Sequence, residues 1–191
     1  MKVLQILPQL NIGGVERGTL DLSKALIHKG HQSFVISGGG VLVDELTQCG
    51  AKHYEIPVHI KSLRTLSLAK RLSETISSID PDIVHVRSRM PAWVNYRAFK
   101  MLQKKPLLVS TFHGLYSFPI YSKVMSFVDH SIAISKTVER YILENYKLDK
   151  GDITVIPRGC DPLEFNNEVI NPVDKANIIE EFPQIVGKKV L

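Results

Sequence analysis

Short apolar runs alternate with longer segments in which apolar residues recur near helical spacing, and this alternation continues through most of the chain. Apolar runs of this length, bounded by turn residues, predict strands. They fall at residues 2–7, 33–37, 53–56, 83–87, 107–111, 131–134 and 153–156. The amphipathic segments predict helices at residues 15–29, 42–49, 63–79, 91–101, around 124 and 136–145. Gly30 is expected to be the left-handed cap of the first helix, and Ser135 the N-cap of the last.

Strands that alternate with helices predict a parallel sheet covered by helices on both faces. The fold class expected for residues 1–166 is therefore α/β, a Rossmann-like doubly wound parallel sheet. Residues 166–172 mix Asn, Glu and Pro like a linker, and a strand is expected to begin at Gly187 and to be cut off at Leu191. Residues 167–191 are accordingly interpreted as a linker and the truncated start of a second domain.

The composition is that of a globular chain of 191 residues that can bury one ordinary core. There are 24 Lys and Arg against 19 Asp and Glu, which gives a net charge of +5. This balance suits phosphate-bearing ligands or an anionic membrane surface, and it equally fits a solvated basic surface. The basic residues form no run and no aromatic platform accompanies them, so nucleic-acid binding is not expected.

Two features bear on compartment and metal binding. Cys49 and Cys160 lie far apart and outside any CxxC spacing, so neither a disulfide framework nor a metal site is expected, and a reducing cytoplasm fits. The first apolar run is cut by Pro8, too early for a signal peptide, and no run reaches transmembrane length. We therefore expect a cytoplasmic protein whose contact with the inner membrane, if any, is peripheral.

The first glycine-rich loop, at Gly13 and Gly14, ends a predicted strand and opens a predicted helix. Backbone N–H groups at such a helix start bind anions, and glycine lets a phosphate approach the main chain. The spacing departs from GxGxxG, the second strand lacks a ribose-binding acid, and no P-loop Lys-Ser/Thr ending follows. A structural turn and a phosphate contact both remain open for this loop.

Two arginines lie at the end of the fourth predicted strand and just beyond it, at the edge of the sheet where ligands of open α/β folds bind. Arg87 and Arg89 alternate, so they are expected to share a face while the strand geometry lasts, and their guanidinium groups suit phosphate or carboxylate recognition. A surface salt bridge or a helix cap is the alternative. His85, inside the apolar run, is expected to be a core histidine.

His113 comes directly after the fifth predicted strand, at the same edge of the sheet. An imidazole there can donate a hydrogen bond to a sugar hydroxyl or a phosphate oxygen, and a purely structural role stays open. The next loop, residues 115–121, is rich in aromatic and apolar residues that suit a lipid, an acceptor ring or the core.

Five segments, taken in order, resemble the N-terminal domain of family 4 glycosyltransferases of the GT-B fold. They are GGVERGTLDLSKALIHKGH, DPDIVHVRSR, TFHG, AIS and VIPRGCDPLEF, and together they span nearly all of residues 2–165. Each segment is weak alone, but five in this order and spacing are specific. The segments VERG, HVRSRMPAW and IPRG look like those of bacterial enzymes that build lipopolysaccharide or other surface glycans.

The resemblance implies transfer of a sugar from a nucleotide-sugar donor to a glycan or lipid-linked acceptor, with retention at the anomeric carbon and no cofactor or obligatory metal. It implies that Gly13, Gly14 and Arg17 approach the donor diphosphate or the acceptor, and that His113 is the catalytic histidine facing the transferred sugar. Arg158 stands where the family usually has asparagine. Together with Arg87 and Arg89 it is expected to bind the acceptor.

The family's C-terminal domain, which grips the nucleotide sugar, is not found in these residues, so the isolated chain is expected to be inactive as a transferase. Two other classes of function are alternatives. One is a non-catalytic Rossmann-like module that binds an anion or a glycan. The other is an NAD-dependent oxidoreductase, which the missing dinucleotide fingerprint argues against.

Overall fold

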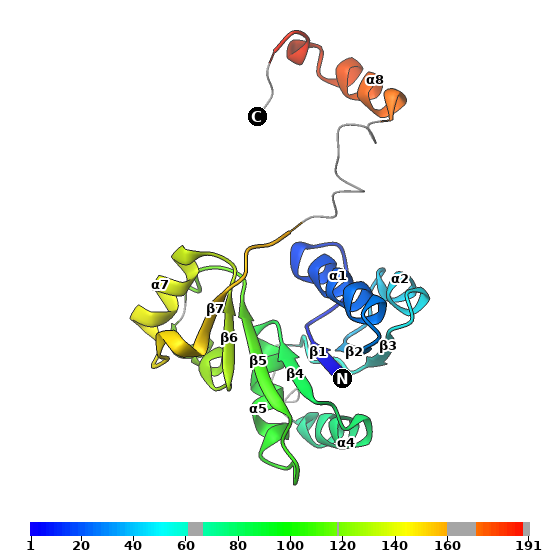
Figure 1. The fold of residues 1–191 in the computed structure, drawn as a ribbon. Helices are drawn as coiled ribbons and strands as arrows, with labels where there is room; N and C mark the ends of the chain where they lie inside the picture. The colour runs from blue at the N-terminus through cyan, green and yellow to red at the C-terminus, as the bar shows by residue number, and fades with distance from the viewer. Residues whose placement is uncertain (61–66, 118, 160–170, 189–191) are drawn as a thin grey trace. The chain divides into compact units, whose positions relative to one another are not determined.

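The computed structural model describes residues 1–60, 67–117, 119–159 and 171–188, and its ribbon is drawn in Figure 1. The chain divides into two units, Met1–Pro157 and Arg158–Leu191, which are described separately. The domain boundary predicted near residue 166 falls within 160–170, outside the described residues.

The first unit is built on one parallel sheet of seven strands in the order β3-β2-β1-β4-β5-β6-β7. The strands are β1 (Lys2–Ile6), β2 (Gln32–Ser37), β3 (Lys52–Glu55), β4 (Ile83–Val86), β5 (Leu107–Phe112), β6 (His130–Ala133) and β7 (Ile153–Val155). Each lies within one or two residues of a predicted strand. This order and the helices between the strands confirm the Rossmann-like doubly wound α/β fold.

The helices are α1 (Gly14–His28), α2 (Val43–Gln48), α4 (Ala69–Ile79), α5 (Arg89–Phe99), α6 (Pro119–Ser122) and α7 (Lys136–Asn145). The predicted helix at 63–79 begins partly in residues 61–66, which lie outside the described residues. The helix predicted around residue 124 is instead the short α6 followed by a 3-10 turn at Lys123–Ser126. Gly30 has the predicted left-handed conformation, with φ of 76°, and the Ser135 hydroxyl accepts from the Val138 N–H as predicted.

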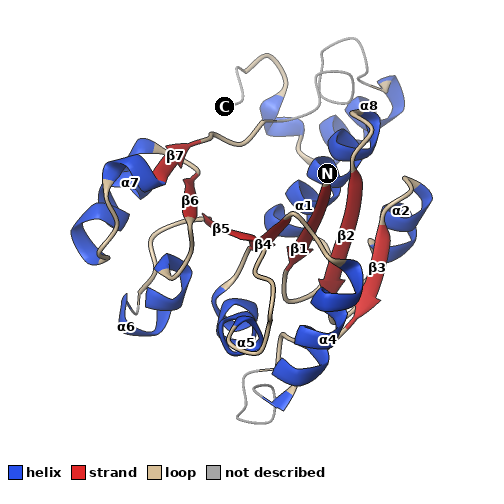
Figure 2. Cartoon of the chain, turned by 60° about the horizontal axis from the view of Figure 1, so that its bottom comes forward, coloured by secondary structure: helices blue, strands red, loops and turns tan. Residues whose placement is uncertain are grey.

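Helices cover both faces of the sheet, and the alternate side chains of β2 belong to two separate core clusters. Phe34 and Ile36 join the larger core cluster, whereas Val35 between them joins the smaller one. Successive residues of a strand point to opposite faces, so the two clusters lie on opposite sides of the sheet. The smaller cluster contains residues of α1 and α2, and the larger one contains residues of α4, α5 and α7. Figure 2 shows this arrangement of the helices around the strands.

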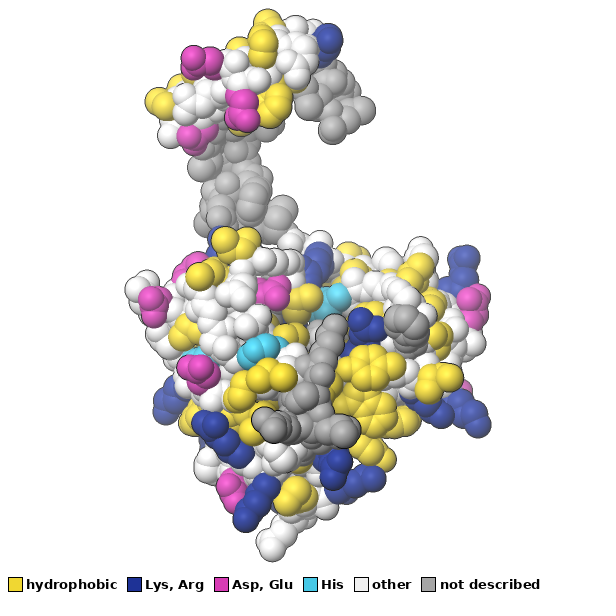
Figure 3. All heavy atoms as spheres, turned by 180° about the vertical axis from the view of Figure 1, so that it is seen from behind, with side chains coloured by type: hydrophobic (Ala, Val, Ile, Leu, Met, Phe, Trp, Pro, Cys, Tyr) yellow, Lys and Arg dark blue, Asp and Glu magenta, His cyan; other side chains and the backbone are white. Residues whose placement is uncertain are grey.

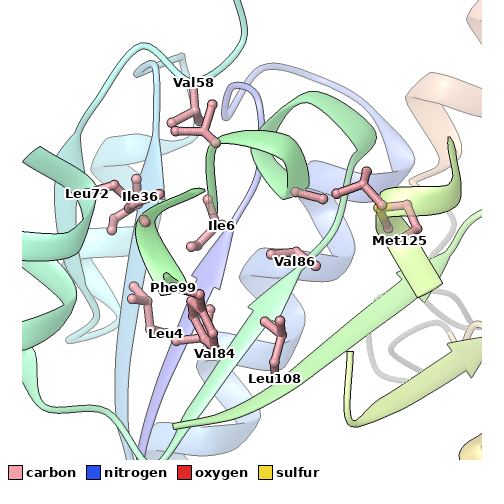
Figure 4. Close-up of a cluster of buried hydrophobic side chains, with 14 of the residues drawn as sticks. Leu4, Ile6, Ile36, Val58, Leu72, Val84, Val86, Phe99, Leu108 and Met125 are labelled. Atoms are coloured by element: carbon pink, nitrogen blue, oxygen red, sulfur yellow. The ribbon is translucent and has the colours of Figure 1, made fainter. Parts of the chain in front are cut away.

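The larger core is made by aliphatic side chains of the central strands packed against α4 and α5. Figure 4 shows Leu72 of α4 beside Ile36 of β2, and Phe99 of α5 beside Leu4 of β1. Leu4, Ile6 and Leu72 have no exposed surface. Burial of such side chains stabilises the fold by about 1.5–3 kcal/mol each. It holds the carboxyl ends of the strands in fixed positions, and the candidate site is built there.

The second unit contains α8 (Pro172–Glu181) and a 3-10 turn at Pro183–Ile185. The polar composition of this region favours a linker, and the helix is not among the predicted elements. The sequence does carry its start signal, because the Asn171 side chain accepts from the Val173 N–H and Pro172 occupies the first helical position. Part of the strand predicted to begin at Gly187 falls in residues 189–191, outside the described residues, and Gly187 itself lies in a turn.

No helix among the described residues is long and apolar enough to cross a bilayer.

Candidate functional site

The candidate site lies at the carboxyl ends of the strands, where two loops after β1 and β2 are joined by main-chain hydrogen bonds. Gly38 N–H donates to the Pro8 carbonyl at 2.9 Å, and Leu10 N–H donates to the Gly39 carbonyl at 2.7 Å. Gly40 has φ of 141°, and a Cβ there would collide with the Leu10 carbonyl. Glycine is therefore required at this position for the two loops to approach.

The Gly13–Gly14 loop opens α1 as predicted, with Gly13 at the N-cap. The first-turn amides and the helix dipole favour an anion at this point. The Glu16 carboxylate already lies beside Gly13, at the place that a Cβ on Gly13 would take. This acidic neighbour is not predictable from the sequence pattern, because its position depends on the side-chain conformation in the folded chain.

The Arg17 side chain lies against α2. Its guanidinium is 3.1 Å from Glu45, and Lys24 is 2.9 Å from the same carboxylate. The Lys24 ammonium is the main cause that lowers the pKa of Glu45, and Arg17 adds to it. The structure thus places the Arg17 side chain in a surface ion cluster between α1 and α2, while its backbone N–H donates to the Gly13 carbonyl at 2.9 Å.

Arg87 is buried and points toward α1. It donates to Gln5 Oε1 at 2.7 Å and to the Gly18 carbonyl at 3.1 Å. Gln5 in turn donates to the Thr19 carbonyl and to Ser23 Oγ, so strand β1, helix α1 and the end of β4 share one buried network. Buried charges persist where hydrogen bonds satisfy them, and this network holds α1 against the sheet.

Arg89 begins α5, and its guanidinium stacks between two tyrosine rings, 4.9 Å from the centroid of Tyr116 and 5.5 Å from that of Tyr121. Arg87 and Arg89 therefore contact different elements. The expectation that they share a face is wrong, because β4 ends at Val86 and the alternation stops before either arginine.

His85 is a buried core histidine, as predicted, with Nε2 at 2.7 Å from Thr111 Oγ1. Burial holds its pKa well below the usual range, and the nearby Arg87 and His113 act in the same direction. His85 is therefore neutral at neutral pH. The charges of Arg87 and His113 are both close enough to His85 to lower its pKa.

His113 follows β5 directly, at the edge where the sequence predicted it, and it is half-buried. The loop after it is held from two sides. The Tyr116 hydroxyl is hydrogen-bonded to the His113 backbone, and the Tyr116 carbonyl accepts from the Tyr141 hydroxyl at 2.6 Å. Burial raises the pKa of Tyr116, which keeps the phenol protonated beside Arg89. His113, Tyr116 and Arg89 thus form a linked, polar and preorganised edge of the sheet.

Arg158 is the first residue of the second unit, and its contact with an acceptor stays a prediction. His59 is a residue that the sequence pattern does not single out. Its ring lies against Gly38, and its Nδ1 is buried without a hydrogen-bond partner among the described residues. A single histidine in a turn after β3 gives no sequence signal.

Among the described residues, no group of His, Cys, Asp and Glu could hold a metal ion.

Comparisons with known proteins agree with this fold. A glycosyltransferase from Rickettsia africae superposes with a TM-score of 0.77 and 36% sequence identity over 95% of this chain and 49% of its own. Anabaena HepE, crystallised with UDP and glucose, superposes with a TM-score of 0.73 and 16% identity over 95% of this chain and 50% of its own. The latter likeness shows the fold alone.

Sequence comparison gives the same family. One subunit of the human phosphatidylinositol N-acetylglucosaminyltransferase is 25% identical over 88% of this chain and 38% of that protein. This chain therefore spans about half the length, or less, of the relatives that it matches. The sequence model of Glycosyltransferase Family 4 matches residues 12–163. The chain belongs to glycosyltransferase family 4.

Proposed function

We propose that the first unit is the acceptor-side wall of a retaining glycosyltransferase that moves a sugar from a nucleotide-sugar donor to a glycan or lipid-linked acceptor. The observation that carries the proposal is the preorganised edge formed by His113, Tyr116 and Arg89 at the carboxyl end of the sheet. Membership of the family and the likeness to HepE, a protein crystallised with UDP-glucose, support a nucleotide-sugar donor.

In this proposal His113 donates a hydrogen bond to a hydroxyl of the transferred sugar and orients it. The first-turn amides of α1, at Gly13 and Gly14, stabilise charge on the leaving diphosphate. Arg89 is held by two tyrosine rings and offers its remaining N–H groups to an anionic part of the acceptor. Arg87 acts indirectly, because its hydrogen bonds to Gln5 and Gly18 hold α1 against the sheet.

The proposal extends to the rest of the enzyme. Residues 167–191 would link to a second domain that grips the nucleotide and completes the cleft, and Arg158 would reach the acceptor from this link. The residues of the first unit alone would then carry no useful transferase activity. The acceptor is proposed to belong to lipopolysaccharide or surface polysaccharide synthesis on the cytoplasmic side of the inner membrane, with peripheral membrane contact.

The test is a transfer and donor-hydrolysis assay with a panel of sugar nucleotides. It compares the 191-residue chain alone with the chain supplied with the C-terminal half of the Rickettsia africae glycosyltransferase. Activity only in the combination is expected, with the anomeric configuration of the product read by NMR. Sustained transfer by the chain alone would contradict the division of labour. Ligand binding without transfer in either sample would favour a non-catalytic binding domain.

A further inference from the structure

A groove of about 680 Å³ lies between α4 and α5, on the face of the sheet opposite α1 and α2. The residues that matter in its lining are Lys70, Trp93, Tyr96, Arg97, Lys100 and Met101. Aromatic, apolar and cationic side chains therefore meet in one place, and no acidic side chain of the described residues lines the groove.

The aromatic side chains continue from the groove onto α6 and the turn after it. Trp93 lies 6.0 Å from Tyr96 and 6.4 Å from Tyr121, and Tyr96 lies 5.3 Å from Phe127, between ring centroids. Phe127 is 39% exposed, and Ile120 beside Tyr121 is 90% exposed. Figure 3 shows hydrophobic side chains gathered on this face with Lys and Arg side chains around them.

The cations around this patch are available to an outside partner. Lys100 Nζ lies 4.3 Å from the ring centroid of Tyr96, and Lys123 Nζ lies 6.0 Å from that of Phe127. Among the described residues, neither these two nor Lys70 and Arg97 form an ion pair, whereas Lys104 nearby is paired with Asp80. Lysines with apolar stems and ammonium groups above aromatic rings suit an interface between apolar and aqueous phases.

We propose that the α4–α5 groove and the neighbouring tip at Ile120, Tyr121 and Phe127 form a docking surface for an anionic lipid bilayer. The cations would contact lipid phosphates, and the exposed apolar side chains would enter the headgroup region. A nucleic acid would satisfy the cations alone and leave Ile120 in water, so the combination favours lipid.

The surface is continuous with the candidate site. Tyr121 contacts both Trp93 of the groove and Arg89 of the sheet edge. A bilayer on this face would therefore bring lipid headgroups to the edge that carries His113. This inference rests on the membrane contact in the proposed function and assigns it to named residues. Vesicle binding and sugar transfer are measured in separate experiments, so failure of one can be distinguished from failure of the other.

The experiment is co-sedimentation of the full chain with vesicles of phosphatidylcholine alone and of phosphatidylcholine mixed with phosphatidylglycerol. Binding to the anionic vesicles, weakening as salt is raised, is expected. The double variant Lys100→Glu/Lys123→Glu should bind at least about 25-fold more weakly, at about fivefold for each cation removed. Ile120→Ser, at a side chain that is 90% exposed, should also weaken binding without affecting the fold.

The matched control is Lys29→Glu/Lys147→Glu, which changes the net charge equally at exposed positions outside the patch. It should weaken binding by less than about threefold. Equal loss in both double variants, unchanged binding by Lys100→Glu/Lys123→Glu, or no binding to anionic vesicles would overturn the proposal. So would binding of a single-stranded oligonucleotide through these lysines in place of vesicles. Thermal unfolding of each variant checks that the fold is kept.

Discussion

Arg87 donates a hydrogen bond to the Gln5 side chain at 2.7 Å, inside the fold and between two neighbouring parallel strands. The Gln5 side-chain amide in turn donates to the hydroxyl of Ser23 in α1. The same hydroxyl also accepts from Ser33 of β2. Helix α1, at whose start a diphosphate is proposed to bind, is thus held along its second and third turns by β1, β2 and the residue after β4. Arg87, which the sequence suggests as a ligand contact, thus has a structural role in this buried network, and its contact with a ligand stays a prediction.

Replacing Arg87 with methionine should destabilise the chain, because Gln5 Oε1 and the Gly18 carbonyl lose their buried donor. The free energy of unfolding is expected to fall by roughly 2–4 kcal/mol. Urea denaturation measures this change. Arg140→Met, on the surface of α7, is the control and should change stability by less than about 0.5 kcal/mol. Equal effects of the two variants would contradict the structural role of Arg87.

Gly40→Ala tests the junction of the two loops. The φ of 141° and the nearby Leu10 carbonyl leave no room for a Cβ. A loss of roughly 1–3 kcal/mol in unfolding free energy is expected. Gly151→Ala is the matched control, because a Cβ there meets nothing within 4 Å and its φ is not positive. An unchanged free energy of unfolding in Gly40→Ala would mean that the two loops can move apart without destabilising the chain.

Protonation of His85 in the unfolded chain should make the free energy of unfolding depend on pH. Its pKa in the folded chain lies well below the usual value, so only the unfolded chain takes up a proton as pH falls below about 6.5. Stability contributed by the neutral, buried ring is then lost progressively, by about 2 kcal/mol between about pH 7 and about pH 5. His85→Gln should flatten this loss, measured by urea denaturation across pH. His28→Gln, at an exposed position, should retain the slope of the parent chain.

The strands and caps could be predicted because their causes are local. An apolar run bounded by turn residues is sufficient for β1, and a hydroxyl before an amphipathic segment is sufficient for the cap at Ser135. His85 was also predictable, since a histidine inside a buried strand needs only one partner, here Thr111.

The site was less predictable because its contacts join distant parts of the chain. Arg17 pairs with Glu45, 28 positions away, and Arg89 stacks on tyrosines from a loop whose path the sequence does not define. The directions of Arg87 and Arg89 depended on where β4 ends, and strand ends are the least certain feature of a sequence pattern.

The Glu16 carboxylate lies beside Gly13 at the start of α1. A diphosphate bound to the same first-turn amides would meet this negative charge. Glu16→Gln keeps the side-chain size and removes the charge, so affinity for a nucleoside diphosphate should rise by about threefold to tenfold at low salt. Isothermal titration of UDP against the chain supplied with the C-terminal half of the Rickettsia africae glycosyltransferase measures this. Asp21→Asn, at an exposed position further along α1, is the control and should leave the affinity unchanged. Weaker binding by Glu16→Gln would mean that the carboxylate contacts the nucleotide directly or holds the loop in its binding conformation.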